Sequence, residues 1–477
     1  MTDGPSDAGA PIAGRRGSRY IGPLATRLLR SRIAANVSGT LYLQLVQIAI
    51  QFGSVPILTL YWGLRDYGIW LILFTFPSYI AMADLGFAAA AINDMTMRTA
   101  RGDRHSAAAT FKALKLILLI MSTVVLLTAL VVIYVLFPDA LTFANTAAHG
   151  HARLTMLSLV AYGVMALASN AICGGYRSVN LFAYCTYIYV TFILAEAVVA
   201  LALVAMGGGL LGAALGYLVI RSISNLVLAI VLRRKVPWLH ATTLHDARSR
   251  IRPLLEPAVS ALALPAAQAL TLQGAVLIIG SAVGPAAVPL FTTIRTLTRT
   301  ALQFTMMVNL SAMPAFSIAA ATDDRMRKAQ LVLLCLAVGA VMLLPAAPAL
   351  LVLGRPIVLI WTHGRVDPSS ELLFVMVVTM LLNGTWMPLS NFILAMNHHG
   401  SFSYFYLLVS GLGIALAYPL GRHMGSEGVA IALTMIDAVM LVRIMVLARR
   451  YHMLDSALFR GIIRQSIDAL RNRRLST

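Results

Sequence analysis

Long apolar runs separated by short polar interruptions cover the chain from Ile33 to Leu447. A helix needs about 20 mostly apolar residues to cross roughly 30 Å of hydrocarbon, and its backbone polar groups must bond within the segment. Cutting the runs at charges and Gly/Pro clusters predicts twelve spans. They cover about residues 36–61, 68–95, 113–137, 153–173, 181–206, 210–232, 254–281, 287–319, 329–353, 372–396, 402–420 and 428–447. The 287–319 run exceeds one span, so we expect it to tilt, to kink at Pro314 or to leave the bilayer in part.

The basic residues give these spans an orientation. Cytoplasmic loops retain Lys and Arg. With the N-terminus inside, 28 of the 37 fall in the inner loops and termini, five fall outside and four lie within predicted helices. Both termini are therefore expected in the cytoplasm. The expected parts are a basic N-terminal segment (1–35), an N-lobe (36–232), a basic cytoplasmic linker (233–253), a C-lobe (254–447) and a basic amphipathic cytoplasmic tail (448–477).

Composition agrees with a polytopic membrane protein and excludes several other classes. The chain is 59% hydrophobic and 12% charged, whereas soluble domains are roughly 45–50% apolar and about 25% charged. The net charge of +19 follows from the loops that flank helices, where anionic lipids attract it, so no nucleic-acid partner is expected. Three scattered cysteines and two His pairs without carboxylate companions predict no metal site and no disulfide framework.

A weak internal repeat predicts two parallel six-helix lobes. A shift of 221 residues places glycines in the first outer loop of each half and Asp-Arg pairs in the first inner loop. The matching positions are Gln47 and Gln268, Gly63 and Gly284, Asp103 and Asp324, and Arg104 and Arg325. Two such lobes around a central cavity are typical of a transporter.

Three arginines inside the predicted spans are candidates for substrate binding. Ionisable groups deep in a membrane cost several kcal/mol and normally face a cavity or a partner. Arg221 lies midway along the sixth span, and Arg295 and Arg299 lie one turn apart on one face of the eighth. Guanidinium groups match phosphate oxygens bidentately. If both faces line the cavity, the cavity suits an anionic guest.

Three acids inside the spans, Asp84, Glu196 and Asp437, are candidates for coupling or gating. A structural role competes in each case. Asp84 would cap a broken turn or pair with a neighbouring arginine. Glu196 and Asp437 would each be neutralised by an arginine across a helix interface. The sequence leaves both interpretations open.

Several short runs resemble the signature of the Wzx-type oligosaccharide flippases and polysaccharide export proteins. In the first half these are Tyr67-Gly68-Ile-Trp70, Ala83-Asp84-Leu-Gly86, Asn93 and Arg101-Gly102-Asp103; in the second half they are Gly280–Gly284, Met313–Ser317 and Asp323-Asp324. The resemblance implies the all-α, two-lobed fold of the multidrug/oligosaccharidyl-lipid/polysaccharide exporter superfamily. It also implies an inner-membrane flippase that moves a polyprenyl-diphosphate-linked oligosaccharide by alternating access for O-antigen or exopolysaccharide assembly, with a polysaccharide polymerase or chain-length regulator as a partner.

Other functions on the same composition fit less well. A multidrug or cation antiporter of this superfamily usually carries a carboxylate in its first helix, where this chain has Asn36, Gln44, Gln47 and Gln51. Lipid II flippases usually have fourteen helices. A polysaccharide polymerase or ligase needs catalytic groups in a large outer loop, and the loops near 138–152 and 354–371 hold no such set. We expect no enzymatic activity, no cofactor and, without a P-loop, no direct use of ATP; proton or sodium coupling stays open.

Overall fold

The computed structural model describes residues 23–82, 84, 86–136, 151–396, 400, 402–454 and 460–461. Nearly all of them are helical. The helices are α1 (Pro23–Ala81), α2 (Phe87–Ala100), α3 (Arg104–Val131), a π-helical turn (Val132–Leu136), α4 (Ala152–Ser178), α5 (Phe182–Ala205), α6 (Gly209–Lys235), η3 (Pro237–His240), α7 (Leu244–Ala282), α8 (Ala287–Ala321), α9 (Arg325–Trp361), α10 (Ser370–Ala395) and α11 (Ser403–Arg450).

By length and apolar composition, the described helices provide up to twelve membrane-spanning segments, the number that the hydrophobic runs predict. Within the described part of the chain, nine helices are long and apolar enough to span, and α8 is a tenth with a 41° bend between Ala287–Met313 and Ala315–Ala321. Gly63 (φ 70°) divides α1 and Gly425 (φ 64°) divides α11, so ten spanning helices become twelve segments. Positive φ is readily available to glycine, which explains both reversals.

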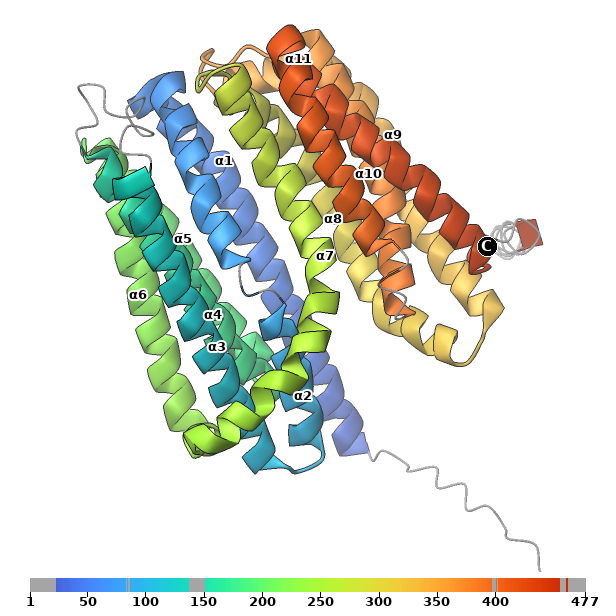
Figure 1. Ribbon diagram of the computed structural model, residues 1–477. Coiled ribbons are helices and arrows are strands. Elements are labelled where there is room, and N and C mark those ends of the chain that lie inside the picture. Colours follow the sequence, from blue (N-terminus) through green and yellow to red (C-terminus); the bar gives the residue numbers. More distant parts are fainter. Residues whose placement is uncertain are drawn as a thin grey trace, which may run out of the picture.

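The segments form two lobes. In the N-lobe, α3–α6 pack together with α1; in the C-lobe, α8–α11 pack together with α7. Figure 1 shows the lobes on opposite sides, with α1 and α7 between them. We call the end that carries residues 101–103, 236–243 and 322–324 the linker end. The end that carries Gly63, residues 283–286 and residues 362–369 is called the far end.

The internal repeat is visible in the local structure. Gly63 (φ 70°) and Gly284 (φ 127°) both occupy reversals at the far end. The Asp103 carboxylate accepts a hydrogen bond from the Ser106 N–H, and the Asp324 carboxylate accepts one from the Arg327 N–H, so both cap a helix at the linker end. The bond from Ser106 stabilises the carboxylate and lowers the pKa of Asp103. The repeat therefore marks helix ends in each lobe.

Several predicted boundaries need correction. The predicted second span (68–95) is not one helix, because α1 ends at Ala81 and α2 begins at Phe87. α7 begins at Leu244, ten residues before the predicted start at 254, because Thr243 and Asp246 form a capping box inside the predicted linker. The long eighth run is bent at position 314, which confirms the kink. The predicted amphipathic tail lies largely outside the described residues, as does most of the basic N-terminal segment.

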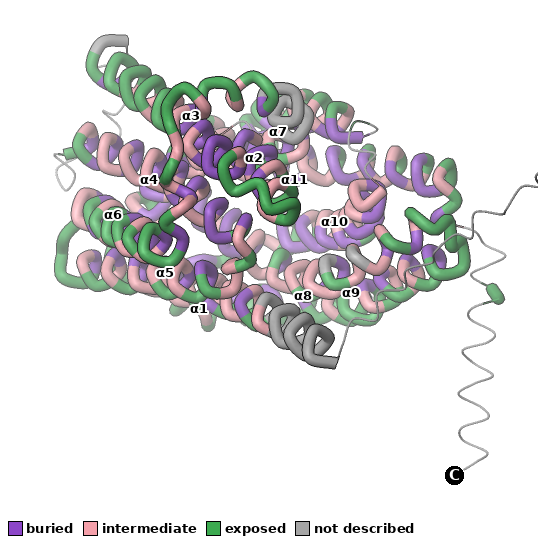
Figure 2. Tube along the Cα trace, turned by 90° about the horizontal axis from the view of Figure 1, so that it is seen from below, coloured by how far each residue is buried: buried purple, intermediate pink, exposed green. Residues whose placement is uncertain are grey.

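The burial of the side chains differs between the interior and the surface of each lobe. Figure 2 shows buried positions concentrated between helices and exposed positions on the outward sides. Many exposed side chains are large and apolar, such as Leu119 (63%) and Val341 (74%). Because water would penalise so much apolar surface and lipid would not, these surfaces fit a hydrocarbon environment.

Candidate functional site

A cavity of about 340 Å³ lies within the C-lobe. Four C-lobe helices line it, and among the described lining residues Gln44 on α1 is the one N-lobe contribution. The lining residues are Gln44, Gln268, Thr271, Leu272, Arg295, Thr298, Arg299, Leu302, Gln303, Met306, Met307, Met376, Thr379, Met380, Asn383, Met387, Tyr406, Leu433, Ile436 and Asp437.

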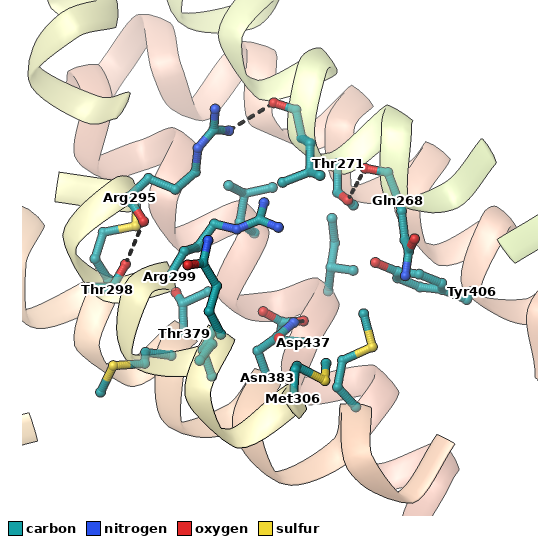
Figure 3. Close-up of a pocket in the computed structure, with 18 of the residues that line it drawn as sticks. Gln268, Thr271, Arg295, Thr298, Arg299, Met306, Thr379, Asn383, Tyr406 and Asp437 are labelled. Carbon is teal, nitrogen blue, oxygen red and sulfur yellow. Dashed lines mark hydrogen bonds between the residues drawn. The ribbon is translucent and has the colours of Figure 1, made fainter. Parts of the chain in front are cut away.

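Arg295 and Arg299 both reach this cavity from α8, as their spacing predicts (Figure 3). Their guanidinium groups have different surroundings. Arg295 donates from Nη1 to the Leu272 carbonyl at 2.8 Å and lies 5.5 Å from the Phe291 ring centroid. Arg299 is exposed, and its guanidinium points into the cavity. Arg295 is therefore fixed by α7, while Arg299 presents N–H donors to a guest.

Asp437 lies in the same cavity on α11 and is held in place from α10. Its Oδ1 accepts hydrogen bonds from Asn383 Nδ2 at 3.1 Å and from Trp386 Nε1 at 2.9 Å. Asp437 is 7% exposed. It has no described ion pair within 4 Å, so Arg299 attracts it only at longer range. The two donors orient the carboxylate toward the cavity (Figure 3).

The charge of the cavity is unbalanced. Two guanidinium groups face one carboxylate among the described lining residues, which leaves one positive charge if all three are ionised. Amide groups of Gln44, Gln268 and Gln303 add hydrogen-bonding capacity, and the Gln44 and Gln303 Oε1 atoms are buried without a protein partner. Methionines supply much of the apolar wall, which adapts to irregular shapes. The arrangement suits an anionic guest that also carries hydroxyl groups.

Arg221 and Glu196 lie apart from this cavity, inside the N-lobe. Arg221 Nη2 is 2.7 Å from Glu196 Oε2, and the side chains are 5% and 1% exposed. Arg221 also donates to the Tyr189 hydroxyl at 2.6 Å and to the Tyr162 hydroxyl at 2.9 Å. The three arginines therefore do not converge on one cavity. Glu196 has the arginine partner across a helix interface that the sequence left as one alternative; a coupling role for it stays a prediction.

Asp84 caps the break between α1 and α2. Its Oδ1 accepts from the Gly86 N–H at 3.2 Å, and its carbonyl accepts from the Phe87 N–H at 2.8 Å. Gly86 has φ 78° at the start of α2. The structure thus displays the capping alternative for Asp84, and a transport role stays untested.

Most of the other signature residues occupy turns or closely packed positions. Tyr67 is 4% exposed, and a Cβ added to Gly68 would lie 1.8 Å from the Pro285 carbonyl oxygen of the C-lobe. Asn93 is exposed on α2. Gly102 (φ 81°) precedes Asp103 in the turn that begins α3. Backbone geometry thus accounts for the signature residues Gly68, Gly102 and Asp103, and a functional role of Tyr67 and Asn93 stays a prediction.

Sequence reasoning missed the residues that orient Asp437. Asn383 and Trp386 come from α10, which contributes no ionisable candidate to the cavity. The sequence does contain an indication of them, because polar groups recur at helical spacing within this otherwise apolar span, at Thr379, Asn383 and Trp386. Such a polar stripe indicates a cavity or a partner.

Comparisons with known proteins agree with this geometry. An inward-facing multidrug resistance MATE transporter of the MOP superfamily matches 86% of this chain and 98% of its own length, with a TM-score of 0.67 and 17% identity. The lipid II flippase MurJ in an inward closed conformation matches 87% of each chain, with a TM-score of 0.66 and 12% identity. At these identities the likeness establishes the fold, so the protein has the two-lobed fold of the MATE and MurJ transporters.

The family follows from the sequence profile. Residues 33–319 match the family described as polysaccharide biosynthesis protein, and the chain belongs to this family. A comparison with curated proteins finds no significant match. The recognised family and the two-lobed fold are therefore confirmed, and the substrate itself is inferred from the site.

Proposed function

We propose that this protein flips a polyprenyl-diphosphate-linked oligosaccharide across the bacterial inner membrane for cell-surface polysaccharide assembly. The observation that carries the proposal is the pair Arg295 and Arg299 in the C-lobe cavity. One guanidinium is fixed by Leu272 and the other is exposed to the cavity. Family membership and the flippase-like fold support the same substrate class.

The orientation follows from the basic residues. The linker end carries most of the Lys and Arg outside the spans, and cytoplasmic loops retain such residues. We assign the linker end to the cytoplasm and the far end to the outside. A polysaccharide polymerase or chain-length regulator would then meet the product at the far end.

The size of the cavity suggests which part of the substrate it binds. A volume of about 340 Å³ is at the lower end of the range for small-ligand pockets. It accommodates the diphosphate and the adjoining sugar, while the polyprenyl chain stays in lipid. Arg299 would bind the phosphate oxygens, with Arg295 adding charge, and the amides of Gln268 and Gln303 would bind sugar hydroxyls. These residues bind and orient the headgroup; no covalent chemistry is required of them.

Charge reversal tests the proposal. R299E and R295E place an acid where the diphosphate would bind, and loss of charge-assisted hydrogen bonds weakens binding by roughly ten- to a hundred-fold. In a deletion strain complemented with either variant, we expect loss of surface polysaccharide and accumulation of lipid-linked oligosaccharide on the cytoplasmic side. Membrane insertion should be unchanged.

A matched control reverses charge away from the cavity. R422E alters an exposed arginine of α11 that does not line the cavity, and it should restore surface polysaccharide as wild type does. Normal surface polysaccharide in R299E and R295E would contradict the assignment.

A multidrug or cation antiporter is the second candidate, because the cavity contains Asp437 and a methionine-rich wall. Such a protein should confer tolerance of cationic drugs. The same deletion strain discriminates the two functions: raised drug sensitivity with unchanged lipid-linked oligosaccharide would favour the antiporter. Glycosyl transfer by the purified protein would instead indicate an enzyme.

A further inference from the structure

The first half of α1 contains backbone carbonyls that its own helix does not satisfy. Phe52 would normally accept a hydrogen bond from residue 56, but Pro56 has no N–H. Gly63 has non-helical angles (φ 70°, ψ −178°). A helix end leaves its last four carbonyls without helical partners. The carbonyls of Thr59 and Leu60 are therefore close enough to this end to need hydrogen-bond donors from elsewhere.

Trp361 of the C-lobe supplies the donor for the carbonyl that Pro56 leaves free. Trp361 is the last residue of α9, and its Nε1 donates to the Phe52 carbonyl at 2.8 Å. The two rings also contact each other, with centroids 4.7 Å apart. A single C-lobe side chain thus supplies the hydrogen-bond donor that the N-lobe helix α1 lacks at Phe52.

Arg365 supplies donors for the helix end beside Gly63. The turn after α9 uses positive φ at His363 (53°) and Gly364 (75°), with Gly364 N donating to the Leu359 carbonyl at 2.7 Å. This turn directs Arg365 toward α1. Its Nη1 donates to the Thr59 carbonyl and, at 2.7 Å, to the Leu60 carbonyl. A cation at a helix C-terminus also interacts favourably with the helix dipole.

The two lobes also pack closely at other positions. The Pro285 carbonyl of the C-lobe lies so near Gly68 that a Cβ there would be 1.8 Å from its oxygen, and a Cβ on Gly280 would be 2.5 Å from Ile72 Cδ1. Along α1, Phe52 and Leu60 lie about 12 and 24 Å beyond Gln44 at 1.5 Å per residue. Because Gln44 lines the cavity, these contacts lie between the cavity and the far end.

We propose that Trp361 and Arg365 form a far-end latch, in which they close the far side of the cavity by binding the α1 carbonyls exposed by Pro56 and Gly63. They are positioning residues that set the balance between the two access states. The proposal extends the alternating access of the proposed function, but it depends on no particular substrate. Separation of the lobes at the far end breaks these bonds and exposes the carbonyls to water.

Distances between spin labels test the latch without any substrate. Labels at Met206, in the turn before α6, and Met424, before the Gly425 reversal, report the separation of the lobes at the far end; both positions are exposed (81% and 48%). The full chain, with its three cysteines replaced, is reconstituted in lipid nanodiscs. Wild type should give mainly one short-distance population.

Two variants should shift this population toward longer distances. W361F keeps the aromatic ring but removes the N–H, so the ratio of open to closed protein should rise about five-fold. R365Q removes bonds from a charged donor, so the ratio should rise about ten-fold or more. R365K retains the cation at the helix end and should recover part of the closed population.

A nearby arginine provides the control. Arg355 pairs with Asp367 in an exposed bidentate contact (2.7 and 2.8 Å) and has no described hydrogen bond to α1. R355Q should leave the distances unchanged. An unchanged distribution in both W361F and R365Q would overturn the latch, as would a lower unfolding temperature with no change in distance. Failure of the proposed substrate would not affect this result.

Discussion

The buried ion pair of the N-lobe permits a quantitative test of whether Arg221 is structural. Glu196 and Arg221 are 1% and 5% exposed, and their charged atoms are 2.7 Å apart. Removing one partner of such a pair costs about 3–5 kcal/mol, because the other charge stays buried without compensation. R221M should lower the free energy of unfolding by this full amount, since Glu196 would retain only the Tyr162 hydroxyl as a described donor.

E196Q should cost less than R221M. Its amide oxygen still accepts from Arg221, and the hydroxyls of Tyr162 and Tyr189 still contact the guanidinium. We expect about 1–3 kcal/mol for this change. The double variant E196L/R221M removes both charges, so its cost should fall well below the sum of the single costs. SDS-titrated unfolding of the purified protein, with R422M as control, measures these free energies.

Transport measured on the same variants completes the test. If the pair is structural, E196L/R221M should retain flipping in proportion to the folded protein recovered. R221M that unfolds like wild type but no longer flips the substrate would refute the reasoning and make Arg221 a substrate-binding residue. The free energy of unfolding and the transport rate thus answer separate questions about one side chain.

Three further changes test the contact regions. Gly68→Val would force a side chain into the Pro285 carbonyl, 1.8 Å from the Cβ position; the far-end label distance should lengthen, and an unchanged distance would contradict the packing. Pro56→Ala restores an N–H that competes with Trp361 for the Phe52 carbonyl, so the open population should rise about as much as in W361F. Asp437→Asn removes one negative charge from the cavity, and calorimetric titration with inorganic diphosphate should show several-fold tighter binding; weaker binding would show that the carboxylate itself is required.

Much of the fold could be predicted because its causes are local in the sequence. Apolar runs set the spans, since each must satisfy its own backbone in lipid. The reversals at Gly63 and Gly284 and the caps at Asp103 and Asp324 were marked by residue types that these local structures require. The apolar run alone puts the start of α7 too late, because the capping box of Thr243 and Asp246 begins the helix before that run.

The site could be predicted only in part because its geometry depends on which helices touch. The i, i+4 spacing placed Arg295 and Arg299 on one face of α8, and the structure confirms that both reach one cavity. No periodicity assigns Glu196 of α5 to Arg221 of α6, since pairing depends on helix rotation. The latch is still harder to predict from the sequence. Pro56 indicates that the Phe52 carbonyl lacks its helical donor, but the residue that donates to it, Trp361, is 309 residues away.

The distribution of charge between the lobes bears on how alternating access would operate in the proposed flippase. The N-lobe arginine is paired within its own lobe with Glu196, whereas both cavity arginines lie on α8 of the C-lobe, where Arg295 is held by the Leu272 carbonyl and Arg299 faces the cavity. A headgroup bound there would move with one lobe, so rocking would leave its contacts with Arg295 and Arg299 intact. Gln44 of the N-lobe is the one described lining residue that would move away from the headgroup. Far-end opening would then change access while the affinity for the diphosphate stays nearly constant, and the latch, rather than the arginines, would determine which side is open.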